Sequence, residues 1–140
     1  QDADSRNQQW RSSTVIRWNE LQTALATAKG QRLFFVDTCH SAAAINPRLI
    51  KDAADARLLV FSATDANTSA QEQAILGHGV FTYAILEGLK GKADMIPDKQ
   101  IMIKELDTYV SYRVPAMTHG AQIPTIHTPG GFTDFVFAKR

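Results

Sequence analysis

The hydrophobic residues of the chain gather in two short, unbroken apolar runs, Leu33–Val36 and Leu58–Phe61, each bounded by polar residues. Runs of this length are typical of strands that are buried on both faces of a sheet. We therefore predict strands at 32–37 and 57–62, with a short helix between them near Arg48–Ala54. Two buried strands joined by a crossover predict a parallel sheet in an α/β domain.

Periodic patterns outside these runs predict the remaining elements. Asn19 and Gln22 have the spacing of a capping box, so a helix is expected to begin at Asn19 and to end near Ala28. Residues 1–17, which begin with a polar stretch, are predicted to form a flexible arm. The other predicted elements are helices at 81–89 and 104–114, the second stopped by Pro115, and strands at 101–103 and 132–138.

Composition narrows the class of protein. The 140 residues are 44% hydrophobic, which suits one domain or a part of one. The net charge of +1 comes without a long basic run, so nothing indicates a nucleic-acid or anionic-membrane partner. The apolar runs are far shorter than the roughly 20 residues of a membrane span. A single cysteine excludes an internal disulfide and leads us to expect a reducing compartment.

The candidate chemistry lies at the end of the first predicted strand, where the only cysteine, Cys39, follows Asp37 by two residues. Active sites of open parallel sheets lie outside the carboxyl ends of the strands, although most single cysteines are inert core residues. Asp37 and Cys39 share a face if the strand stays extended. A carboxylate opposes ionisation of a neighbouring thiol, so Asp37 is not an activator. It fits a cation brought by the substrate; alternatively, it caps a loop or pairs with a local arginine.

The motif around Cys39 gives a family resemblance. Asp37-Thr38-Cys39-His40-Ser41 resembles the Asp-x-Cys-His-Ser-Gly nucleophile motif of metacaspases and prokaryotic caspase homologues. Ala42 stands where the family usually has Gly. The resemblance covers roughly Trp18–Val136, and its further matches are the segments 59–64, 70–72, 79–84, 105–110 and 122–124.

The resemblance implies a caspase-like α/β fold, with a mostly parallel central sheet flanked by helices. Residues 1–140 would form the C-terminal portion, about half to two-thirds, of a single catalytic domain. The implied activity is that of a bacterial, cytoplasmic cysteine endopeptidase that cleaves after Arg or Lys, with Cys39 as the nucleophile and Asp37 in the substrate pocket. Asp65 and Glu72 follow the second strand and either add negative charge to that pocket or are solvated loop residues.

The family's catalytic histidine precedes its cysteine, but no histidine precedes Cys39. Of the four histidines, His40 is adjacent to Cys39, so its side chain diverges. His78 lies in a Gly-His-Gly that imitates the family motif, but it stands where the family has its downstream Gly-Phe-Thr segment. We therefore expect the base on a companion N-terminal fragment, produced by autoprocessing of a zymogen. The first residue, Gln rather than Met, is in keeping with proteolytic release.

Other kinds of site fit the sequence less well. A Cys-x5-Arg phosphatase loop would need Arg at Ile45, and one cysteine with scattered histidines gives no zinc-ligand spacing. We expect no cofactor, because no calcium-loop motif is present, although some metacaspases are activated by calcium. The alternative function is a catalytically inactive caspase-like module that binds partners; the presence of both Asp37 and Cys39 favours the enzyme.

Overall fold

The fold centres on a three-stranded sheet with the strand order β1-β2-β4. The computed structural model describes residues 17–37, 47–65 and 79–140. The strands are β1 (Arg32–Val36), β2 (Leu58–Asp65) and β4 (Gln122–His127). β1 runs parallel to β2, whereas β4 runs antiparallel to it, so the sheet is mixed. The predicted parallel pair is therefore confirmed for β1 and β2, and the antiparallel β4 is a strand that the apolar runs did not predict.

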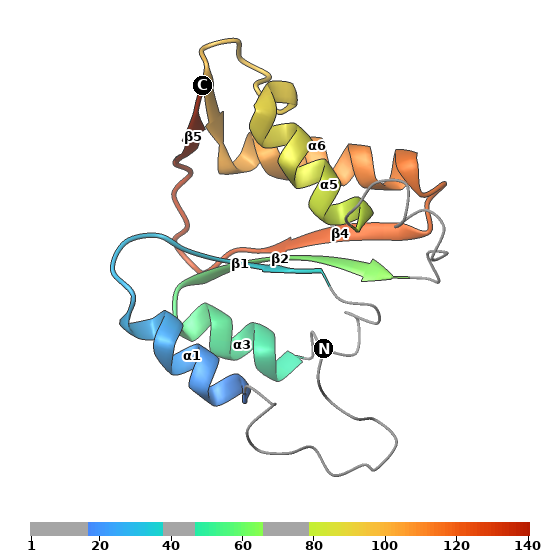
Figure 1. Ribbon diagram of the computed structural model, residues 1–140. Coiled ribbons are helices and arrows are strands. Elements are labelled where there is room, and N and C mark those ends of the chain that lie inside the picture. Colours follow the sequence, from blue (N-terminus) through green and yellow to red (C-terminus); the bar gives the residue numbers. More distant parts are fainter. Residues whose placement is uncertain (1–16, 38–46, 66–78) are drawn as a thin grey trace.

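Helices cover both faces of this sheet, as Figure 1 shows. On one face lie α1 (Trp18–Thr27) and α3 (Pro47–Asp55), and on the other lie α5 (Val80–Glu87) and α6 (Ile103–Met117). A π-helical turn, η2 (Gly88–Lys92), continues α5. A separate two-stranded sheet pairs β3 (Gln100–Met102) with β5 (Val136–Lys139) near the C-terminus.

The core forms on both sides of β2, because every second side chain of a strand points to the same face. Leu59 and Phe61 pack with the buried residues of α5 and α6, whereas Leu58 and Val60 pack with Ala53 of α3. Burial of each such large side chain contributes roughly 1.5–3 kcal/mol. The prediction of a strand buried on both faces is thus confirmed for β2, and over residues 32–35 β1 is only half-buried.

Helix boundaries differ from the prediction at two places. The N-cap of α1 is Arg17, two residues before the predicted cap, and its backbone N–H donates to the Glu20 carboxylate at 3.4 Å. Pro115 lies inside the last turn of α6 and does not end it. The helix ends two residues later, at Met117, and the chain then turns through Gly120, whose φ of +80° suits glycine.

The N-terminus of α6 is fixed by a buried carboxylate. Glu105 is 9% exposed and accepts hydrogen bonds from three backbone N–H groups: those of Met95 at 3.2 Å, Ile96 at 3.1 Å and Met102 at 2.9 Å. A negative charge at the start of a helix also interacts favourably with the helix dipole. The loop before β3 is thereby tied to the helix that supports α5. None of the helices in the described ranges combines the length and the apolar character needed to cross a bilayer.

Candidate active site

The carboxyl ends of β1 and β2 lie at the same edge of the sheet, because the two strands are parallel and in register from Arg32–Leu58 to Val36–Ser62. The N-terminus of α5 lies at this edge as well (Figure 1). Asp37 follows the buried Val36 directly and is exposed. The chain thus changes from a buried residue to an exposed carboxylate at the end of β1, which is where the active sites of α/β proteins lie.

The first turn of α5 holds the Asp37 carboxylate. The Thr82 hydroxyl donates a hydrogen bond to Asp37 Oδ2. Gly79, the N-cap of α5, lies against the same group: a Cβ added there would be 2.5 Å from Oδ2 and 3.0 Å from Oδ1. The positive end of the helix dipole favours a carboxylate at this position. Asp37 therefore has a structural partner in the first turn of α5, and it is exposed.

The other residues of the predicted site are described only in part. Cys39 and Glu72 lie outside the described residues. Asp65 ends β2, where its backbone pairs with Gln122 of β4. Because Val36 pairs with Ser62, β2 continues three residues beyond the level of β1, and Asp65 and Asp37 both lie toward the same edge of the sheet. Their roles in substrate binding stay predictions.

Two of the four histidines, His119 and His127, lie in the described part of the chain. His127 pairs with Val60, five residues before the carboxyl end of β2. His119 lies in the turn between α6 and β4. Both belong to the β4 side of the sheet, and β2 separates β4 from β1, which puts about 10 Å between the two outer strands. His40 and His78 lie outside the described residues.

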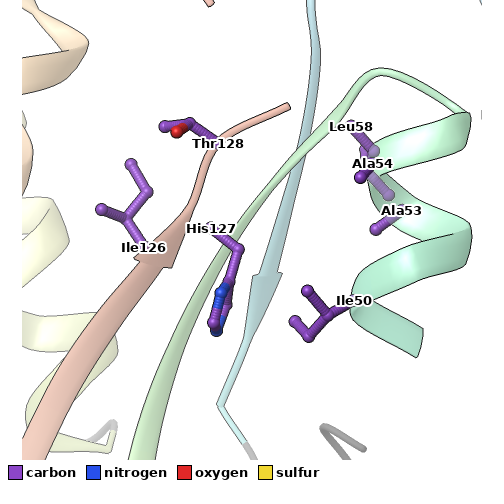
Figure 2. Close-up of a pocket in the computed structure, with 7 residues that line it drawn as sticks. All are labelled: Ile50, Ala53, Ala54, Leu58, Ile126, His127 and Thr128. Carbon is purple, nitrogen blue, oxygen red and sulfur yellow. The ribbon is translucent and has the colours of Figure 1, made fainter. Parts of the chain in front are cut away.

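His127 instead lines a cavity of about 290 Å³ between β4 and α3. Figure 2 shows its imidazole on the side of β4 that faces Ile50 and Ala53, whereas Ile126 points to the opposite side. The lining residues are Ile50, Ala53, Ala54, Leu58, Ile126, His127 and Thr128. In the described part of the chain no group of three or more His, Cys, Asp or Glu side chains is placed to hold a metal ion.

A polar cluster fastens the far end of α5 to α6. Glu87 Oε2 accepts hydrogen bonds from the Tyr109 hydroxyl at 2.7 Å and from Arg113 Nε at 2.8 Å. These two hydrogen bonds lower the pKa of Glu87, and burial together with Glu87 raises the pKa of Tyr109 to about 12. The cluster keeps α5, and with it Thr82, in place. Its function was not predicted, because residues 22 and 26 positions apart share no sequence signal.

The pKa of Glu87 makes a testable prediction for stability. A carboxyl whose pKa is lowered by folding stabilises the protein above its unfolded value of 4.5, and this contribution is lost as the pH falls through the folded pKa. The free energy of unfolding of the wild type should therefore exceed that of Glu87→Gln near pH 7, and the difference should shrink between about pH 5 and pH 3. Urea unfolding at a series of pH values measures it.

Tyr109→Phe provides the second arm of that experiment, because it removes the largest cause of the lowered Glu87 pKa. In this variant the folded pKa of Glu87 lies closer to its unfolded value, so the acid-dependent loss of stability should be smaller and should be complete at a higher pH than in the wild type. If the difference in the free energy of unfolding between the wild type and Glu87→Gln stays constant from pH 7 to pH 3, Glu87 does not hold the two helices together through its charge.

Together, a mixed sheet covered by helices on both faces and a carboxylate at the carboxyl ends of its parallel strands define an α/β protein with a candidate site at that edge. A family model described as the caspase domain matches residues 6–135. The chain belongs to this caspase family of cysteine peptidases, which confirms the resemblance noted from the sequence and implies protein substrates. Searches among curated proteins and among solved structures found no match.

Proposed function

We propose that this chain carries the nucleophile of a cysteine endopeptidase that cleaves after Arg or Lys. Cys39 attacks the scissile carbonyl, and Asp37 binds the positively charged side chain before it. The observation that carries the proposal is the exposed Asp37 carboxylate at the end of β1, two residues before the only cysteine of a caspase-family chain. Asp37 lies at the edge of the sheet where the carboxyl ends of β1 and β2 meet, and Cys39 follows it by two residues in the sequence.

The proposed reaction is acyl transfer through a thioester. A histidine takes the Cys39 proton, and the thiolate adds to the peptide carbonyl. The backbone N–H of Cys39 donates to the oxyanion, the amine leaves with a proton from the histidine, and water then hydrolyses the acyl-enzyme. The thiol, the imidazole and the backbone donors supply every group that these reaction steps need, so the proposed reaction requires no cofactor.

The proposed specificity follows from the chemistry of a carboxylate. Its two oxygens offer about four acceptor positions, of which Thr82 uses one. The remaining positions suit the two parallel N–H groups of a guanidinium, so Arg is preferred over the single ammonium of Lys. Negative charge from Asp65 and Glu72 would strengthen the attraction. An Asp side chain before the scissile bond would be repelled.

The base is proposed to come from a companion N-terminal fragment. The position of His127, which pairs with Val60 five residues before the carboxyl end of β2, supports this, as does the half-buried apolar run of β1, which a further part of the domain would cover. Among the histidines of this chain, His78 has the strongest competing position, because it directly precedes Gly79, which contacts the Asp37 carboxylate.

Hydrolysis of matched peptide reporters by the protein expressed from its complete natural reading frame tests the proposal. Reporters ending in Arg should be cleaved fastest, those ending in Lys more slowly, and those ending in Asp not measurably; EDTA should leave the rates unchanged. Faster cleavage after Asp would overturn the assignment of Asp37. Absence of cleavage of all three, with the protein folded and its subunits complete, would favour the inactive binding module.

A further inference from the structure

The Asp37 carboxylate is oriented by groups that come from a different part of the sequence. Thr82 lies in the first turn of α5, 45 positions after Asp37, and its hydroxyl donates to Oδ2. On either side of this turn, Phe81 is 1% and Ala84 0% exposed, so the helix is anchored in the core. We propose that Thr82 is a positioning residue that sets the preference for Arg over Lys by fixing the plane of the Asp37 carboxylate. This inference rests on the proposed function.

Arg and Lys differ in how strongly they depend on that plane. A guanidinium bound by two parallel N–H groups needs both carboxylate oxygens in one orientation, whereas an ammonium is a compact charge with rotatable donors. Rotation of the carboxylate about its Cβ–Cγ bond therefore weakens Arg binding more than Lys binding. The hydrogen bond from Thr82, which lies on a helix anchored in the core, to Asp37 Oδ2 restricts this rotation.

Gly79 defines the other limit on the carboxylate. Its φ of −58° and ψ of 148° are accessible to any residue, so the backbone does not require glycine there. The requirement comes from the neighbour: a methyl group would lie 2.5 Å from Oδ2, whereas ordinary contact begins near 3.4 Å. Ala at this position must displace the carboxylate. Gly79 and Thr82 thus hold the same group from two directions.

Removal of the Thr82 hydroxyl tests the inference. Thr82→Val keeps the shape of the side chain and should lower the ratio of kcat/KM for Arg to that for Lys by about threefold to tenfold, chiefly through KM for Arg. Thr82→Ser restores the hydroxyl and should restore the ratio. Gly79→Ala should lower the ratio in the same direction, because it moves the same carboxylate.

The matched control is Thr108→Val in α6, which removes a hydroxyl that donates to the Lys104 carbonyl of its own helix, at 2.8 Å. It should leave the Arg-to-Lys ratio unchanged. A merely structural role of Thr82 would reduce the folded fraction and lower both kcat/KM values equally, with no change in the ratio. If the wild type cleaves after Arg and this cleavage depends on Asp37, that outcome would overturn the inference about Thr82 and leave the proposed function standing. A wild type that cleaves after neither Arg nor Lys would instead overturn the proposed function.

Discussion

Replacement of Cys39 by Ala should abolish peptide hydrolysis, with a loss in kcat on the order of 10⁴-fold or more, because no other group can form the acyl-enzyme. The chain contains no second cysteine that could substitute for it. Release of the fluorescent product from an Arg-ending reporter, followed over hours at high enzyme concentration, measures the residual rate. Circular dichroism of the variant should match that of the wild type, because the substitution removes only one sulfur atom from the chain.

A second variant separates the nucleophile from the source of the base. His78→Ala should retain activity within a few-fold of the wild type if the histidine comes from the companion fragment. A loss as large as that of Cys39→Ala would place the base at His78 and contradict the two-fragment arrangement, while leaving Cys39 as the nucleophile. Activity that persists in Cys39→Ala would refute the assignment of the nucleophile itself.

Replacement of Asp37 should remove cleavage after Arg selectively. Truncation of one partner of a hydrogen-bonded charge pair costs about 2–5 kcal/mol, so kcat/KM for an Arg reporter should fall by roughly 100-fold or more. Because Asp37 also contacts the N-terminus of α5, Asp37→Asn is the better variant than Asp37→Ala. The amide keeps an acceptor for Thr82 and loses only the charge.

The control for Asp37→Asn is the reactivity of Cys39 toward a small neutral alkylating agent. Since Asp37 is proposed to bind substrate and not to activate the thiol, the alkylation rate should stay the same or rise slightly when the negative charge is removed. A variant that loses alkylation and Arg cleavage together would indicate a collapsed site. Unchanged cleavage after Arg would show that another acidic group, with Asp65 and Glu72 as the candidates, selects the substrate.

The elements that the sequence predicted well are those whose signal is local. An unbroken apolar run predicts a buried strand because both faces of the strand are covered, and β2 is covered on both faces. β1 carries a similar run but is half-buried over residues 32–35, since in the described part of the chain it lies at the edge of the sheet. Local sequence does not reveal which neighbour a strand will have.

β4 was missed for a related reason. Its sequence, Gln122–His127, contains Pro124, which argues against a central strand, and its burial does not follow a continuous run. Proline is tolerated because β4 pairs with only one strand, β2, within the described residues. Pro115 similarly falls in the last turn of α6, where few further backbone hydrogen bonds are lost.

In the candidate site, too, local features could be predicted from the sequence and contacts between distant residues could not. Asp37 and Cys39 were predicted as site residues from their position after a strand and from a motif, and both of these signals are local. The contacts of Asp37 with Thr82 and Gly79 join residues more than 40 positions apart and depend on how α5 packs on the sheet. No periodicity or spacing encodes such a contact, so the group that orients the carboxylate emerges only from the fold.

The central claim is that Cys39 attacks substrates selected by a neighbouring carboxylate, and covalent labelling tests it most directly. The complete protein is treated with two peptidyl acyloxymethyl ketones that differ only in ending with Arg or with Asp, and the modified peptide is identified by mass spectrometry. We predict a thioether on Cys39 from the Arg reagent and none from the Asp reagent at equal concentration. Modification of Cys39 by the Asp reagent in preference, or of no cysteine by either reagent, would contradict the account.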